Sequence, residues 1–108
     1  MDKPTEKIRW TERASADVEA NVRYLKRRNP DAAAQIGRGI FKRVEILWDH
    51  PEIGAYLDEL REQGWRKLVY RRWKIIYTYR DPVIIIGRVW PAAMGEADLT
   101  KPLDSSDD

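Results

Sequence analysis

Three apolar segments follow one another near the C-terminal end of this chain, and only short links separate them. The alternation and the β-branched and aromatic content predict strands over residues 66–71, 74–80 and 83–90. Parallel strands need a crossover of a dozen or more residues between them. The short links therefore restrict the three segments to an antiparallel meander and exclude parallel pairing between neighbouring segments.

The residues before these strands predict two helices. Apolar side chains recur at spacings of three and four over 12–28, and Thr11 stands where an N-cap belongs. A second such pattern covers 30–49 and begins with Pro30, a residue favoured in the first helical turn. The short connection at 29–31 predicts that the two helices form an antiparallel hairpin.

These elements complete an expected order of β-α-α-β-β-β. A short strand is predicted at 8–10, and 51–65 is predicted as a loop with a short helical or extended piece around 55–62. The fold class is therefore expected to be α+β, with the helical hairpin packed on a small, mainly antiparallel sheet. We expect one domain over 1–95, followed by an acidic and partly disordered tail over 96–108.

Charge is segregated along the chain. Residues 61–90 hold eight Lys and Arg side chains against two acids, whereas the next 18 residues hold one Lys and five acids. The whole chain carries a formal charge of only +2. A basic sheet of this kind predicts an acidic partner, which can be nucleic acid or an acidic protein surface, although Lys and Arg also serve simply to solvate a sheet face.

The composition excludes several classes of site. The chain has no cysteine and a single histidine, so a disulfide framework, a thiol nucleophile and a zinc site of His and Cys ligands are excluded. No carboxylate set has metal-ligand spacing, and we expect neither a metal nor a cofactor. With no apolar run that could span a membrane and no apolar signal segment, we expect no membrane partner and a cytoplasmic protein.

Several segments, taken in order, resemble the RelE/ParE superfamily of toxins from type II toxin–antitoxin systems. Residues 47–54 (LWDHPEIG) look like the Leu-x-x-x-Pro-x-x-Gly turn of ParE-type chains. Residues 73–77 (WKIIY) and 84–90 (IIIGRVW) look like two of the family's sheet strands. The likeness spans roughly residues 8–95.

The resemblance implies a function. Within the superfamily, the chain is most similar to the ParE-like branch, and this similarity implies a non-catalytic toxin that inhibits DNA gyrase by binding it. A cognate antitoxin would neutralise the toxin, and the toxin would form oligomers mainly with that antitoxin. The alternative is a RelE-like endoribonuclease that cuts mRNA on the ribosome.

The residues themselves favour binding over catalysis. RNA cleavage needs a proton acceptor and a proton donor beside cations that hold the phosphate. Beyond the last strand, no general acid or base occurs before Glu96, so we name no catalytic residue. The candidate target-binding residues are the cations and tryptophans of the strands: Arg66, Lys67, Arg71, Arg72, Trp73, Lys74, Arg88 and Trp90.

Two further side chains carry specific expectations. Trp73, flanked by Arg72 and Lys74 at a hairpin, is expected to be the most exposed tryptophan and a contact residue. Asp17 on the first helix is expected to be exposed, the alternative being a pair with an arginine of the sheet.

Overall fold

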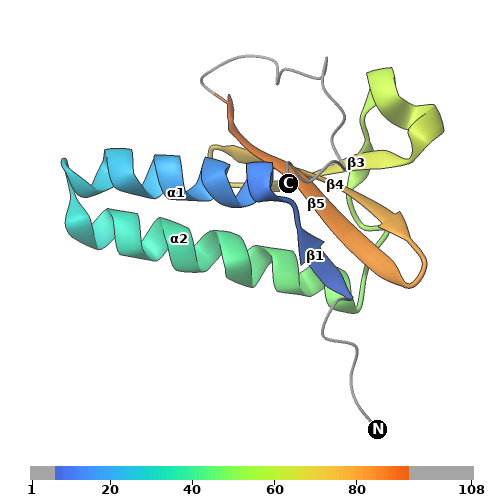
Figure 1. Cartoon of the computed structure of the whole chain (residues 1–108), viewed down its shortest axis with the longest axis horizontal. Helices are drawn as coiled ribbons and strands as arrows, with labels where there is room; N and C mark the ends of the chain where they lie inside the picture. The colour runs from blue at the N-terminus through green and yellow to red at the C-terminus, as the bar shows by residue number, and fades with distance from the viewer. Residues whose placement is uncertain (1–6, 93–108) are drawn as a thin grey trace, which may run out of the picture.

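The structure is a computed structural model that describes residues 7–92 (Figure 1). Its elements follow in this order: β1 (Ile8–Trp10), α1 (Glu12–Lys26), α2 (Pro30–Glu45), the 3-10 turn η1 (Ile46–Trp48), β2 (Ala55–Tyr56), the 3-10 segment η2 (Asp58–Gln63), β3 (Trp65–Tyr70), β4 (Trp73–Arg80) and β5 (Val83–Pro91). The expected α+β fold is confirmed. The predicted domain end at 95 and the acidic tail at 96–108 lie outside the described residues.

The strands form one sheet in the order β1-β5-β4-β3-β2. Strands β2 to β5 pair antiparallel with their neighbours, and β1 runs parallel to β5. The predicted loop at 51–65 contributes both an edge strand, β2, and the short helical segment η2. Figure 1 shows α1 and α2 side by side on one face of the sheet, as the short connection between them predicts.

Side-chain caps set where the two helices begin. The Thr11 hydroxyl accepts a hydrogen bond from the Ala14 N–H at 3.1 Å, and the Asn29 side chain accepts one from the Ala32 N–H at 3.1 Å. Both caps satisfy backbone donors that a first helical turn leaves free. Both helices end earlier than predicted, α1 at 26 and α2 at 45. Helix α2 stops there because residues 46–48 tighten into a 3-10 turn ahead of Pro51.

The sheet has an apolar cluster on each face. The larger lies under the helices and the smaller lies under η2 on the opposite face. The buried members of the larger cluster are Ala14, Val18, Ile36, Ile40, Val44, Leu47, Leu68, Trp73, Ile75, Tyr77, Ile84, Ile86 and Val89; those of the smaller are Trp65, Ile76 and Ile85. A central strand covered on both sides explains the uninterrupted isoleucine run of β5. Within residues 7–92, no helix is long and apolar enough to cross a membrane.

Candidate functional site

The sheet face turned away from the helices gathers most of the predicted contact residues. Successive strand residues point to opposite faces, and Leu68 and Ile75 belong to the helix-side cluster. Their chain neighbours therefore project to the other face. Cross-strand pairing aligns them in two rows, Val69–Lys74–Trp90 and Lys67–Ile76–Arg88. We call the surface formed by Lys67, Val69, Lys74 and Trp90 the basic face; Arg88 belongs to the second row but is buried, at 8% exposed.

The hairpin between β3 and β4 extends this surface with two more cations. Arg71 and Arg72 form its two-residue turn between the paired residues Tyr70 and Trp73, and both are exposed. Arg71 has a φ of 53°, in the left-handed region where glycine or asparagine is favoured. Five of the eight predicted residues thus lie together, on the basic face or at this adjoining turn, and Arg88 lies buried beside them.

Arg66 lies apart from that group and holds a loop in place. Its guanidinium donates hydrogen bonds to the carbonyl oxygens of Glu52 and Gly54, at 3.0 and 2.7 Å, and to the Tyr56 hydroxyl at 2.9 Å. It also stacks on the Tyr56 ring, 4.1 Å from the ring centroid. Arg66 therefore links β3 to the segment before β2.

The prediction that Trp73 is the most exposed tryptophan is wrong. Its side chain projects toward the helices, and only 9% of the residue is exposed. The reason is the strand period: Trp73 shares a face with Ile75 and Tyr77, so the register that buries those two also buries Trp73. Lys74 projects the other way, and Arg72 is exposed at the turn.

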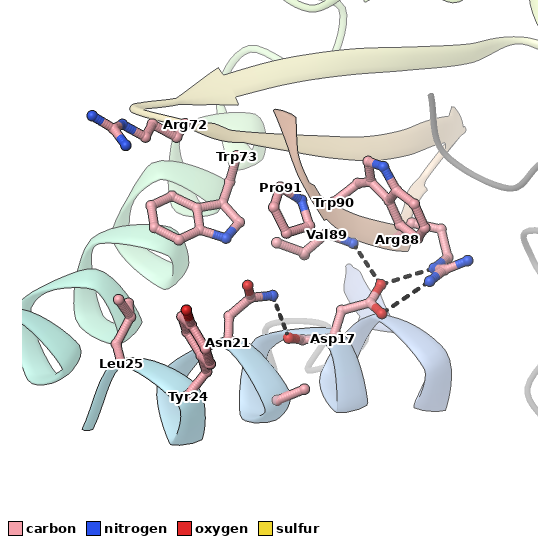
Figure 2. A pocket seen from close by; sticks show the side chains of 11 residues that line it. Asp17, Asn21, Tyr24, Leu25, Arg72, Trp73, Arg88, Val89, Trp90 and Pro91 are labelled. Carbon is pink, nitrogen blue, oxygen red and sulfur yellow. Dashed lines mark hydrogen bonds and ion pairs between the residues drawn. The ribbon is translucent and has the colours of Figure 1, made fainter. Parts of the chain in front are cut away.

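The expectation that Asp17 is exposed is also wrong, and the structure assigns it a central role. Its carboxylate accepts hydrogen bonds from Arg88 Nε at 2.8 Å and Nη2 at 3.0 Å (Figure 2). It also accepts the backbone N–H of Val89 at 2.9 Å. Because β1 ends at Trp10, no strand within residues 7–92 pairs with the edge of β5 beyond Ile86, and Asp17 satisfies the Val89 N–H there instead.

The sequence carries one signal for this contact. Asp17 and Asn21 are four residues apart and border the apolar stripe of α1, where a polar side chain reaches the rim of a packed interface. The Asn21 amide donates to the backbone carbonyl of Asp17 at 2.7 Å. The identity of the arginine partner, 71 residues along the chain, has no sequence signal.

A groove of about 780 Å³ lies between α1 and the C-terminal part of β5 (Figure 2). We call it the α1–β5 groove. Its lining residues are Asp17, Ala20, Asn21, Tyr24, Leu25, Arg72, Trp73, Arg88, Val89, Trp90 and Pro91. The indole Nε1 of Trp73 is buried and has no hydrogen-bond acceptor among the described residues. The groove is thus mainly apolar, with one unsatisfied donor.

The tyrosines of the sheet serve as structural groups. The Tyr77 hydroxyl donates to the Pro51 carbonyl and accepts the Gly54 N–H, both at 2.9 Å, and burial raises its pKa above the ordinary value. Burial and the hydrogen bond that the Tyr79 hydroxyl donates to Asp81 raise the pKa of Tyr79. Raised pKa values keep both phenols neutral, so neither is suited to act as a general base.

Residues 7–92 contain no cluster of three or more His, Asp or Glu side chains that could hold a metal ion. The basic face and its turn offer cations, the tryptophan Trp90 and the exposed apolar side chain of Val69. Such a surface can bind an acidic partner.

Comparison with known proteins gives a family match and a structural match. The sequence model of the ParE toxin of type II toxin–antitoxin systems, parDE, matches residues 8–95. A chain from a solved structure described as the chromosomal ParDE TA system from P. aeruginosa has a TM-score of 0.67. That match has 22% identity and covers 79% of this chain and 94% of the other, so it supports the fold. The search of curated protein sequences finds no match.

Proposed function

Since this chain belongs to the ParE toxin family of type II toxin–antitoxin systems, we propose that it inhibits DNA gyrase by binding and that a cognate antitoxin neutralises it. A gyrase inhibitor acts where the chromosome lies, so the proposal includes a cytoplasmic location. The oligomers of the protein are then mainly those formed with its antitoxin.

The observation that supports this proposal most directly is the convergence of cations on the basic face. Lys67 and Lys74 occupy neighbouring rows of the sheet, and Arg71 and Arg72 follow at the turn. Val69 lies among them and is 51% exposed. A cationic surface with an apolar centre suits an acidic protein partner, because charge steers the encounter and apolar burial holds the complex.

The surroundings of these cations favour binding over RNA cleavage. Tyr77, the best-buried tyrosine of the sheet, lies on the helix side and is hydrogen-bonded to the loop that precedes β2. The Arg88 guanidinium is held by the Asp17 carboxylate, which neutralises its charge in place. Among the described residues of the basic face, no carboxylate, imidazole or phenol is positioned to exchange a proton with RNA.

A supercoiling assay with purified gyrase tests the proposal. We expect the protein to inhibit supercoiling, and Lys74→Glu to weaken that inhibition at least about tenfold, since like charge across an interface costs more than about 1.4 kcal/mol. Lys42→Glu makes the same charge change at an exposed position of α2 and should leave inhibition unchanged.

Pulse labelling of DNA and protein synthesis in cells tests the proposal against the alternative of RNA cleavage. A gyrase inhibitor should reduce DNA synthesis first. Early loss of protein synthesis, with cleaved mRNA and unaffected supercoiling, would contradict the proposal and identify a ribosome-dependent endoribonuclease. In that case the cations Lys67, Arg71 and Lys74 would be the first residues to test for phosphate contacts.

A further inference from the structure

The α1–β5 groove opens where the described chain ends. Pro91 is one of its lining residues, and the Ala92 N–H donates to the Arg72 carbonyl at 2.7 Å. This hydrogen bond holds the last described residue against the start of β4. The described chain therefore ends beside Arg72, one of the residues that line the groove.

The buried indole of Trp73 indicates that the groove takes an occupant. The residue is 9% exposed, and its Nε1–H has no acceptor within residues 7–92. Figure 2 shows the ring projecting from β4 toward α1, among the lining residues of the groove. A buried donor without an acceptor is unfavourable, and an occupant that brings a carbonyl oxygen removes that penalty.

The charges around the groove favour an acidic occupant. Among the described residues that line it, Asp17 is the only carboxylate, and that carboxylate is already engaged by Arg88 and the Val89 N–H. Arg72 lines the groove and is exposed. Arg28 adds a second cation, stacked 4.9 Å from the ring centroid of Tyr24, which also lines the groove.

The chain itself holds a segment of matching chemistry. Residues 93–108 contain five acids and one Lys, with Met94, Leu99 and Leu103 spaced among them. Sixteen residues can span roughly 50 Å when extended, at about 3.3 Å each, which is ample for a segment that starts at the groove. Because the segment is tethered there, its effective concentration is on the order of millimolar, so even weak contacts suffice.

We propose that residues 93–108 fold back into the α1–β5 groove of the free protein. A backbone carbonyl of the segment accepts the Trp73 Nε1–H, its apolar side chains contact Leu25 and Val89, and its carboxylates face Arg72 and Arg28. A protein partner that uses this groove must displace the segment, which lowers the affinity of the free toxin for it. The inference does not depend on whether gyrase is the target.

Paramagnetic relaxation enhancement in the full chain tests this placement. The protein has no cysteine, so Ser105→Cys gives a single site for a nitroxide label. The indole N–H signals report on the groove and on sites away from it, each assigned by a single Trp→Phe substitution. We expect the label to remove most of the Trp73 signal intensity, and to spare Trp65, which is buried in the cluster on the opposite face.

A matched pair of tail variants completes the design. Leu99→Asp with Leu103→Asp in the labelled chain should restore the Trp73 signal, and Thr100→Ser should not. These substitutions lie outside residues 7–92, and the unchanged Trp65 signal reports that the domain stays folded. A Trp73 signal that the label leaves intact would overturn the proposal.

Two other results would also overturn it. Broadening of Trp90 and Trp65 without Trp73 would locate the segment on the basic face. Broadening that disappears on dilution would mean that the groove is filled by a second copy of the protein.

Discussion

At the scale of single residues, Asp17 joins elements that the chain order keeps far apart. Its side chain is 15% exposed and that of Arg88 is 10% exposed, so both charges are largely removed from water. A pair of this kind contributes little net stability, but the loss of one member leaves the other charge buried without compensation. Asp17 also satisfies the Val89 N–H at the free part of the β5 edge.

Asp17→Asn is therefore expected to lower the free energy of unfolding by about 3 kcal/mol. Asparagine keeps the shape of aspartate but brings no charge to Arg88. Urea unfolding measures the change, and Glu19→Gln, at an exposed position of the same helix, should cost less than about 0.5 kcal/mol. Equal stability of Asp17→Asn and the unchanged protein would show that the pair is unimportant for folding.

Tyr77 likewise connects its own strand to a segment distant in the sequence. Its hydroxyl holds the segment 51–54 against the sheet through Pro51 and Gly54. Tyr77→Phe leaves the buried Gly54 N–H without its acceptor and should cost about 1–3 kcal/mol near neutral pH. Urea unfolding of Tyr77→Phe beside Tyr24→Phe, an exposed tyrosine of α1, measures this difference.

The raised pKa of Tyr77 predicts an alkaline loss of stability. Above about pH 10 the unfolded chain releases the Tyr77 proton while the folded chain retains it, so the unfolded state binds fewer protons. The free energy of unfolding should then fall as the pH rises from about 10 to the folded-state pKa. Tyr77→Phe should lose less stability than the unchanged protein over this range; parallel curves would contradict the assignment.

At the scale of elements, the two glycines inside α2, Gly37 and Gly39, lie in different surroundings, and only one of them is required by packing. A Cβ on Gly39 would overlap the Tyr70 ring and hydroxyl, because α2 crosses β3 at that point. A Cβ on Gly37 would meet Val22 of α1 at 3.4 Å, an ordinary contact distance. Close packing therefore requires glycine at 39 against the sheet, and it does not require glycine at 37 against the other helix.

Alanine substitutions should separate the two positions. Gly37→Ala should raise the free energy of unfolding by up to about 1 kcal/mol, the helix propensity difference. Gly39→Ala should lower it, because Tyr70 must leave its position to admit the methyl group. Thermal unfolding of both variants measures the difference in sign, and stabilisation by Gly39→Ala would show that Tyr70 moves freely.

At the scale of the whole molecule, the forces that fold the chain are separate from those that we assign to its function. Two apolar clusters hold the helices and η2 to the sheet, and the Asp17–Arg88 pair joins helix to strand. The cations of the basic face and its turn, partly or fully exposed, take no part in those clusters. The fold should accordingly respond little to ionic strength.

Raising NaCl from about 50 to 500 mM should change the free energy of unfolding by less than about 1 kcal/mol. The same change should weaken gyrase binding far more, since screening acts on the exposed cations. Unfolding curves and a binding titration in matched buffers measure the two effects. A binding affinity that is insensitive to salt would argue against the basic face as the contact surface.

Local patterns were sufficient to predict the elements and their order. Caps at Thr11 and Asn29, helical periodicity and short links between strands act over a few residues, so they can be read from the chain directly. The same patterns placed the cations of the basic face on or beside the strands, but not on a particular face of the sheet. They indicated a short helical or extended piece around 55–62 but not which of the two, because the two residues of β2 are extended only through their pairing with the edge of β3.

The tertiary structure alone decided which face each side chain occupies and which distant groups meet. Strand register buried Trp73 and turned its neighbour Lys74 to the opposite face, and a shift of one residue would have reversed this outcome. The early end of β1 exposed the β5 edge that Asp17 satisfies. Pairings of this kind depend on the relative position of packed layers, which no short stretch of sequence encodes, because a side chain's partner is set by where its whole element docks.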